Sequence, residues 1–361
     1  MAEMTSKERI LGAIRGEKTD RVPWSPFLAY YWEHLPAQDR NCGQLEYMKR
    51  KGADPLLRGF NVLYHAKRHG CEHTHTNNGR TMTDTYTTKV GTLTEIRTYS
   101  PSGNTWFLTG HPVKTEEDFK TLQYIMENTE ITENLAGFER EYAAIGEEAV
   151  TAPSIGLNQK TAFQAMVEHW CGTEQLVYAL CDYPETVEEC LDVIRERNME
   201  TLRISVRSSA DVFNFFEDSS TTNISPAMFE EYTAPEINAW GKLIHQEGKL
   251  LMHHACGHLK GLLPKIAETE IDILESISPP PTGNVDIAEC AERLPGHIAL
   301  IGGIEPTFFR NCSMDALEKR VIELLTAMKG KRYVLANSDS CPPGVAYEKF
   351  LLISELVRKH G

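Results

Sequence analysis

The sequence lacks the features of a membrane, secreted or repeat protein. No apolar run is long enough to cross a bilayer. The first ten residues contain no apolar core of a secretory signal peptide. Internal repeats and low-complexity segments are also absent, which argues against a solenoid or a disordered chain. We therefore expect a cytoplasmic protein that does not have a membrane as its partner.

Positive charge is scarce, and the cysteines do not form a paired set. The net charge is −14, which argues against nucleic acid as the main partner. The nine cysteines are odd in number and scattered over 361 residues. This is not a disulfide framework, so we interpret them as free thiols, buried packing residues or metal ligands. The composition, 41% hydrophobic and 24% charged, is typical of a globular protein.

Short apolar runs alternate with amphipathic segments of helical length from about residue 145 onward. Strand, helix, strand in this order predicts βαβ units and a parallel sheet, and six such strands favour a (β/α)8 TIM barrel. No glycine-rich phosphate loop follows the first strand, so a dinucleotide-binding fold has no support. The predicted strands are Ala149–Ile155, Asp211–Phe216, Lys249–Cys256, Ile271–Ile277, Ile298–Ile304 and Tyr333–Asn337. The predicted helices between them include Pro184–Arg207, Pro226–Gln246 and Ser313–Met328.

The first 140 residues predict a different kind of structure. Thr5 and Glu8 have the spacing of a capping box, which predicts a helix through Ile14. Residues 80–112 are rich in threonine and alternate in polarity, which predicts one or two antiparallel hairpins with a turn at Pro101–Asn104. A helix should follow over Lys114–Met126. We expect one barrel domain over residues 1–361, with residues 1–140 as a helical and hairpin elaboration and 145–361 as most of the barrel.

The predicted strand Lys249–Cys256 and the two residues after it are rich in possible metal ligands. Three histidines and a cysteine lie there within a span of six residues, from His253 to His258. Side chains alternate along a strand, so His254 and Cys256 share one face and His253 takes the other. The C-terminal ends of barrel strands carry active sites, and an imidazole with a thiolate suits zinc. The alternative is a buried cysteine and histidine with no metal. His258 follows the strand and either contacts substrate or caps the next helix.

Further ligands should come from other strand ends. Cys341 follows the last apolar run and is placed in a loop by Pro342–Gly344. Glu217 closes the run Val212–Glu217 and is our candidate for a fourth ligand or a catalytic acid, with Asp218 beside it. Five further cysteines have no such setting and are interpreted as packing or unpartnered residues: Cys171, Cys181, Cys190, Cys290 and Cys312.

A second histidine-rich stretch lies at residues 65–79. His73 and His75 alternate and would share one face of a strand. We interpret the stretch as a solvated loop or hairpin edge. The alternative is that these two histidines line a funnel above the barrel.

Four segments together resemble the uroporphyrinogen decarboxylase superfamily over nearly the whole chain: Ser6–Pro26, Ile224–Trp240, Leu250–Ile277 and His297–Pro306. The resemblance implies a (β/α)8 barrel. Decarboxylases of this family carry an arginine-rich segment after an N-terminal Arg-x-Pro motif, whereas this chain has no arginine from Val22 to Asp39. A substrate with many carboxylates would lack its cationic clamp. The other branch contains zinc- and corrinoid-dependent methyltransferases, whose His-x-Cys and distant Cys ligands His254, Cys256 and Cys341 match.

The methyltransferase branch performs two kinds of reaction. One transfers methyl from a methyl donor such as a methoxylated aromatic to the Co(I) corrinoid of a partner protein. The other transfers methyl from a methyl-corrinoid to a thiol such as coenzyme M. No Asp-x-His-x-x-Gly cobalamin motif is present, so the corrinoid must come on a partner. Aromatic residues of the expected funnel favour the O-demethylase: Phe27, Tyr30, Tyr31, Trp32, Tyr64, Phe213, Phe215 and Phe216. Glu217, Asp218 and His258 are the expected catalytic residues.

Overall fold

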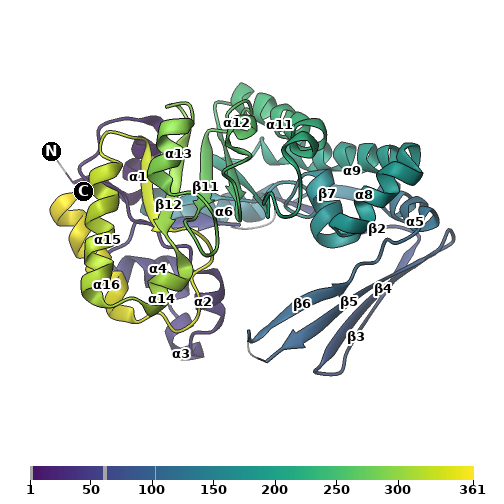
Figure 1. The fold of residues 1–361 in the computed structure, drawn as a ribbon, viewed down its shortest axis with the longest axis horizontal. Coiled ribbons are helices and arrows are strands. Elements are labelled where there is room, and N and C mark those ends of the chain that lie inside the picture. The colour runs from purple at the N-terminus through teal and green to yellow at the C-terminus, as the bar shows by residue number, and fades with distance from the viewer. Residues whose placement is uncertain (1–2, 60–62, 102) are drawn as a thin grey trace. The chain divides into compact units, whose positions relative to one another are not determined.

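Parallel strands form most of the larger unit in the computed structural model, which describes residues 3–59, 63–101 and 103–361. Five strands lie in the order β13–β12–β11–β10–β9, and all neighbours are parallel. A second parallel pair joins β1 to β8. The bounds are β1 (Leu56–Arg58), β8 (Val150–Ala152), β9 (Val212–Glu217), β10 (Leu250–Ala255), β11 (Ile273–Ile277), β12 (Ala299–Ile304) and β13 (Tyr333–Asn337) (Figure 1).

Two single-residue bridges close these strands into a ring. Ser154, just after β8, bridges Asn214 of β9, and Trp24 bridges Leu335 of β13. The Asp54 amide, two residues before β1, donates to the Trp24 carbonyl. The ring therefore has eight parallel positions, and the predicted (β/α)8 barrel is confirmed. Its first two positions, at Trp24 and β1, are too short to give a strand pattern in the sequence and were not predicted.

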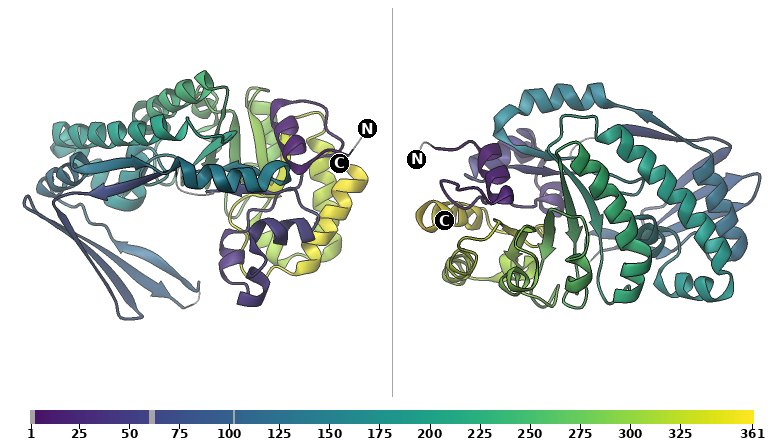
Figure 2. Two further views of the ribbon diagram at one scale, coloured as in Figure 1. Left: turned by 180° about the vertical axis from the view of Figure 1, so that it is seen from behind. Right: turned by 90° about the horizontal axis from the view of Figure 1, so that it is seen from above.

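The barrel unit comprises the described parts of residues 1–62 together with Ala136–Ser154 and Ser208–Gly361. Helices follow the strands along the green-to-yellow course of the chain in Figure 2. Predicted helix Ser313–Met328 is α15, and predicted helix Pro226–Gln246 is α10, η3 and α11 in succession. The bounds are α1 (Ser6–Arg15), α2 (Ala29–Glu33), α3 (Ala37–Arg40), α4 (Gly43–Arg50), α6 (Leu135–Ile145), η1 (Gly146–Glu148), α10 (Pro226–Met228), η3 (Phe229–Thr233), α11 (Ala234–Gln246), α12 (Leu263–Ile266), α13 (Ile287–Arg293), α14 (Pro306–Asn311), α15 (Met314–Ala327) and α16 (Tyr347–His360).

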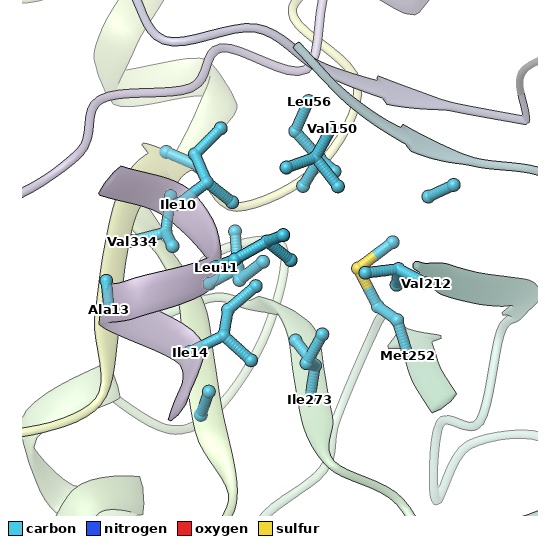
Figure 3. Packing of buried hydrophobic residues seen from close by; sticks show 14 residues of the cluster. Ile10, Leu11, Ala13, Ile14, Leu56, Val150, Val212, Met252, Ile273 and Val334 are labelled. Carbon is cyan, nitrogen blue, oxygen red and sulfur yellow. The ribbon is translucent and has the colours of Figure 1, made fainter. Parts of the chain in front are cut away.

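Helix α1 fills the end of the barrel where the strands begin. Thr5 and Glu8 form the predicted capping box, which satisfies backbone donors of the first turn. The apolar side chains of α1 pack among those that point inward from the strands (Figure 3). Val212 of β9 and Met252 of β10 belong to this cluster. Val212 and Met252 therefore identify which residues of β9 and β10 face the barrel interior. Because α1 fills the end where the strands begin, a site can lie at the C-terminal ends of the strands.

The second unit comprises residues Leu63–Leu135 and Ile155–Arg207. The predicted hairpins form an antiparallel sheet in the order β3–β4–β5–β6, and residue 102 of the predicted turn lies outside the described residues (Figure 1). The N-terminal elaboration was expected to cover residues 1–140, but residues 3–59 belong to the barrel unit. The second unit also includes the predicted helix Pro184–Arg207, which is α9. The bounds are β2 (Tyr64–Arg68), β3 (Cys71–Asn77), β4 (Thr81–Thr88), β5 (Thr92–Ser100), β6 (Thr105–Gly110), α5 (Glu116–Glu127), β7 (Thr129–Glu133), α7 (Ala162–Ala165), η2 (Met166–Trp170), α8 (Thr173–Asp182) and α9 (Pro184–Ser205).

Within residues 3–59, 63–101 and 103–361, no helix combines the length and apolar character that a bilayer-spanning helix needs.

Candidate functional site

The C-terminal ends of β9, β10 and β11 bring polar side chains together inside the barrel. In the parallel register, His254 of β10 pairs with Phe216 of β9 and with Glu275 of β11. Paired residues of neighbouring strands share a face of the sheet. Met252, two residues before His254, lies in the inward-facing core. His254, Phe216 and Glu275 therefore face the interior above this core, as predicted for His254.

A buried chain of charged groups fixes the ring of His254. Arg58 Nε of β1 pairs with Glu275 Oε1, and both side chains are at most 2% exposed. His254 Nδ1 lies 3.0 Å from Glu275 Oε2. Burial by itself would raise the pKa of Glu275, but Arg58 and His254 together hold this pKa below its usual value. The carboxylate therefore stays ionised and accepts a hydrogen bond from His254 Nδ1. Such a carboxylate fixes the orientation of the imidazole ring.

The other ring nitrogen of His254 faces the loop after β13. Asp339 Oδ1 of this loop lies 3.7 Å from His254 Nε2, and the Asp339 side chain is 40% exposed. Two phenylalanines flank the imidazole. The ring centroid of Phe216 lies 5.0 Å from that of His254, and the centroid of Phe27 lies 5.5 Å away. The two phenylalanine rings are nearly parallel, with an interplanar angle of 18°. His254 Nε2 therefore lies between aromatic surfaces and a carboxylate.

Cys256, Asp218 and His258 lie on the segments that leave β9 and β10. Cys256 is half-buried, and its thiol lies 3.6 Å from the Glu217 carbonyl. Asp218 accepts a hydrogen bond of 2.7 Å from Asn223 Nδ2 and lies against Gly257. His258 binds the loop after β9 through its backbone, which donates to Ser220 Oγ and accepts from Thr221. Cys256 directly follows β10, and its backbone amide donates to the Glu217 carbonyl; its place on the His254 face stays a prediction.

Glu217 does not face this site, which corrects its assignment as a metal ligand and catalytic acid. It pairs with Ala255, and both lie on the helix-facing side of the sheet. Its carboxylate is fully buried with His253, with Glu217 Oε2 3.2 Å from His253 Nε2. Ser219 Oγ also lies 3.2 Å from each of these two atoms. The reason is strand periodicity, because Phe216 takes the inward position and Glu217 must take the outward one.

Cys341 is buried on the loop that follows β13. The side chain is fully buried, and its thiol lies 3.9 Å from the Pro342 carbonyl. Burial raises the pKa of the Cys341 thiol well above its usual value, and the Lys51 ammonium offsets only part of this effect. The Cys341 amide donates to Phe27, and the Cys341 carbonyl accepts from Tyr31. Among the described residues, Cys341 does not form a metal-holding group with His254 and Cys256.

The described residues do not form the predicted four-ligand centre. Across residues 3–59, 63–101 and 103–361, no group of three or more His, Cys, Asp or Glu side chains is arranged to hold a metal ion. His254 and Cys256 carry the nitrogen and sulfur donors that zinc accepts. Glu217 lies on the opposite face of the sheet, and Cys341 is fully buried.

Lys51 is a buried cation that no sequence pattern predicted. It is 1% exposed, and its ammonium has no hydrogen-bond partner among the described residues. The ammonium lies over three aromatic rings, at 4.4 Å from the centroid of Tyr47, 3.1 Å from that of Tyr347 and 4.8 Å from that of Phe350. Burial lowers the pKa of Lys51 to about 8. Protonated Lys51 is therefore held in the fold at a free-energy cost that its cation–π contacts offset only in part.

Replacing Lys51 with methionine is expected to raise the free energy of unfolding by about 1–3 kcal/mol at pH 7. The folded-state pKa of about 8 lies below the usual 10.5, so the unfolded chain binds more protons between these values. Wild-type stability should therefore rise with pH over this interval, and the advantage of Lys51→Met should shrink. Urea denaturation from pH 7 to pH 10 measures both. Lys49→Met, at an exposed position of α4, is the control, and an advantage that did not change with pH would contradict the prediction.

Only part of the expected aromatic funnel lies near His254. Phe27 and Phe216 flank it, whereas Phe213 and Phe215 are fully buried on the opposite face, where Phe215 packs edge-on against Trp240. Tyr31 is also buried and hydrogen-bonds Tyr47. The remaining expected members have other settings: Tyr30 is 51% exposed, Trp32 packs against Tyr47, and Tyr64 belongs to the second unit. The surface beside His254 is thus two rings rather than eight.

His73 and His75 lie on β3, the edge strand of the antiparallel sheet of the second unit. Both contact Asp84 Oδ1 on β4, at 2.8 and 3.0 Å. Their side chains are about half exposed, and the ring of His73 stacks on Tyr86. The interpretation as a hairpin edge is confirmed.

Arg58, Glu275 and Asp339 were not predicted from the sequence. A signal existed for Glu275, which is the single charged residue inside the apolar run Ile271–Ile277 apart from Asp272 at its start. Arg58 ends a strand of three residues, which is too short to show a pattern. Asp339 lies two residues from Cys341, and sequence alone could not tell which of them faces His254.

Comparison with known proteins agrees with the fold and the sequence motifs. The sequence model "Uroporphyrinogen decarboxylase (URO-D)" matches residues 109–360. Uroporphyrinogen decarboxylase of Parasynechococcus marenigrum (strain WH8102) is 27% identical over 168 residues, or 46% of this chain and 45% of that protein. The corresponding protein of Prochlorococcus marinus (strain MIT 9211) is 22% identical over 241 residues, or 66% of each. The chain thus spans about half the length of the first of these relatives.

A solved structure described as a methyltransferase from Methanosarcina mazei superimposes with a TM-score of 0.65. The superposition covers 99% of both chains at 15% sequence identity, so it speaks for the fold alone. Family membership comes from the sequence match, which covers well over half of the 361 residues. This chain belongs to the uroporphyrinogen decarboxylase family.

Proposed function

We propose that this chain is a methyltransferase that transfers a methyl group from a methoxylated aromatic compound to the Co(I) corrinoid of a partner protein. The observation that carries the proposal is the oriented imidazole of His254. Glu275 holds its Nδ1 at 3.0 Å, and Nε2 lies on the side of Asp339, whose Oδ1 is 3.7 Å away. A carboxylate that orients a histidine in this way is typical of histidines that bind a metal or transfer a proton.

The charges at the mouth speak against decarboxylation of a substrate with many carboxylates. Such a substrate needs free guanidinium groups for bidentate binding. Arg58 faces the interior from β1, but its guanidinium already pairs with Glu275 and donates to the Leu56 and Ser25 carbonyls. The segment Val22–Asp39, which precedes and follows the first barrel position, has no arginine. The positive charge of Arg58 is thus neutralised by Glu275 inside the barrel.

The two phenylalanines beside His254 suit an aryl substrate. Phe27 and Phe216 are nearly parallel, with centroids 6.0 Å apart, and each also contacts the His254 ring. Aromatic side chains around a few polar groups are typical of sites for small aromatic molecules. A methoxyarene could pack against these rings with its ether oxygen towards His254 Nε2. The aromatic surface therefore favours an aryl methyl ether as the methyl donor.

The reaction requires activation of the ether oxygen. Transfer of the methyl group to a Co(I) corrinoid would break the bond between the methyl carbon and the ether oxygen, and the electron pair of that bond would stay on the aryl oxygen. Asp339 is the acidic side chain whose carboxylate lies beside His254 Nε2, at 3.7 Å. A bound zinc ion supplies Lewis acidity at such an oxygen, and His254 and Cys256 are the residues that would hold it. Glu217 does not fit this role, because it lies on the opposite face of the sheet.

The proposal is tested by mixing the protein with a corrinoid protein reduced to Co(I) and a panel of methoxyarenes. We expect the absorption of methyl-cobalt to appear together with the matching phenol, which mass spectrometry identifies. Phenols that lack the methoxy group are the control. Methyl transfer only from methylcobalamin to thiols would support the coenzyme M-type reaction instead. Release of carbon dioxide from uroporphyrinogen would show a decarboxylase, and either result would overturn the proposal.

A further inference from the structure

We infer that the second unit contains a binding site for a small organic carboxylate on one face of its antiparallel sheet. Arg68 of β2 binds the carboxylate of this ligand, and Arg97 of β5 and His169 of η2 provide further hydrogen-bond donors. All residues of the site belong to the second unit. The inference therefore does not depend on the reaction proposed for the barrel.

A pocket of about 280 Å³ lies on this face of the sheet. Strand pairing brings four of its side chains together, because Met82 of β4 lies opposite Arg97 of β5, and Asp84 lies opposite Glu95. Residues of β2 and η2 line the rest of the pocket. This volume is near the lower end of the range for small-molecule sites, so the ligand must be small.

The guanidinium of Arg68 is the cation of the pocket without an acidic partner. It lies over two aromatic rings, 5.0 Å from the centroid of Tyr86 and 5.9 Å from that of Trp170. Among residues 3–59, 63–101 and 103–361, no carboxylate forms an ion pair with Arg68. Cation–π contacts use the face of a guanidinium, whereas its N–H donors bind a carboxylate in a bidentate way. Arg68 is therefore suited to bind an anionic group that enters the pocket.

Arg97 and His169 make the same pocket favourable for an anion. Arg97 pairs with Glu95 through Nε, which donates to Glu95 Oε1 at 2.6 Å, so the two terminal nitrogens of Arg97 remain for a ligand. Burial lowers the pKa of His169 to about 4, and three neighbouring basic groups lower it further: Lys160, Arg97 and His111. His169 is thus a neutral donor at pH 7 in a region of positive potential.

The acidic residues of the pocket limit the charge of the ligand. Burial by itself would raise the pKa of Asp84, but hydrogen bonds with His75 and His73 hold this pKa below its usual value. Asp84 is therefore ionised, and Glu95 lies opposite it on β5. Two carboxylates would repel the double negative charge of phosphate, whereas a planar monoanion can still bind Arg68. The pocket therefore favours a monocarboxylate over phosphate.

Isothermal titration calorimetry of the full chain with butyrate and benzoate tests the inference. We expect at least one of these acids to bind with a Kd below about 1 mM. Butyramide, benzamide and inorganic phosphate should bind at least about tenfold more weakly, because the amides lack the charge and phosphate is repelled. Arg68→Met should weaken binding of the acid at least about tenfold. Arg68→Lys keeps the charge without the planar fork and should give an intermediate affinity.

Two control variants locate the site. Arg80→Met changes an exposed arginine just before β4 and should leave the affinity unchanged. His254→Ala should also leave it unchanged, because His254 belongs to the barrel unit. Unfolding curves verify that each variant is folded.

Four results would each overturn the inference: no binding of either acid below about 1 mM, equal binding of the amides or phosphate, unchanged affinity in both Arg68 variants, or loss of affinity in His254→Ala. None of these measurements involves a corrinoid protein. Failure of the carboxylate site and failure of the proposed methyl transfer are therefore distinguishable.

Discussion

Replacing Arg58 with methionine is expected to lower the free energy of unfolding by about 3–5 kcal/mol at pH 7, as is typical when one partner of a buried ion pair is removed. Arg58 and Glu275 are at most 2% exposed, and the pair lies inside the barrel. Without the guanidinium, the Glu275 carboxylate would still contact His254 but would lose its buried cation. Urea denaturation monitored by circular dichroism gives the change directly.

The pH dependence of this loss follows from the direction of the Glu275 shift. In wild type, the folded-state pKa of Glu275 is lowered, so its contribution to stability is present above its unfolded value near 4.5 and is lost as the pH falls through the folded value. The difference between wild type and Arg58→Met should therefore be largest near neutral pH and shrink in acid. The double variant Arg58→Met/Glu275→Gln should recover part of the loss.

An exposed ion pair serves as the control for Arg58. Arg50 pairs with Glu46 on α4, and both side chains are substantially exposed, at 60% and 44%. Arg50→Met should change the free energy of unfolding by less than about 0.5 kcal/mol. A loss below about 1 kcal/mol for Arg58→Met, or one that did not depend on pH, would show that Arg58 does not hold Glu275 ionised.

Replacing His254 with alanine is expected to reduce methyl transfer about 10²–10⁴-fold while the protein stays folded. The imidazole is the group that Glu275 orients towards the mouth, so its removal takes away the nitrogen that would hold a metal or a proton at the substrate. Arg58 still neutralises Glu275 in this variant. Initial rates of methyl-cobalt formation at saturating donor measure the effect.

Two comparisons separate a functional role of His254 from a structural one. Added imidazole should restore part of the activity of His254→Ala, because it can occupy the vacated position, whereas it should not improve wild type. The control variant is His297→Ala. His297 is exposed and lies just before the first residue of β12, whereas the site lies at the C-terminal ends of the strands, so this variant should leave the rate unchanged. Activity of His254→Ala within threefold of wild type would exclude His254 from the reaction.

Strand alternation separated the two histidines of β10 correctly. His254 faces the interior, and His253 lies on the other side, stacked on Phe215. The same rule could have placed Glu217. Asn214 is the one polar residue between two phenylalanines in β9, and it marks the inward positions, so Glu217 falls on the outward set. The assignment was wrong because it followed the end of the apolar run rather than the alternation.

The first two barrel positions could not be predicted from the sequence, because their segments are too short to show a strand pattern. Trp24 enters the barrel by a single bridge and β1 by three residues, so their strand character comes from neighbours that are distant in sequence. Arg58 acquires its role only because β1 pairs with β8 and thereby closes the ring that contains Glu275. Helix α9 has a clear helical pattern, but nothing in that pattern assigns it to the second unit.

By itself, the sequence determined the parallel barrel, the hairpin sheet, the capping box of α1 and the inward face of His254. All of these follow from short-range periodicity and local hydrogen bonding, which neighbouring residues specify. Only the tertiary structure decided that Glu275 and Arg58 orient His254, that Asp339 faces its free nitrogen, and that Cys341 is held beside Lys51. These contacts join strands and loops far apart in the chain, so they depend on how the ring closes and on which side chain of a loop the surrounding packing directs inward.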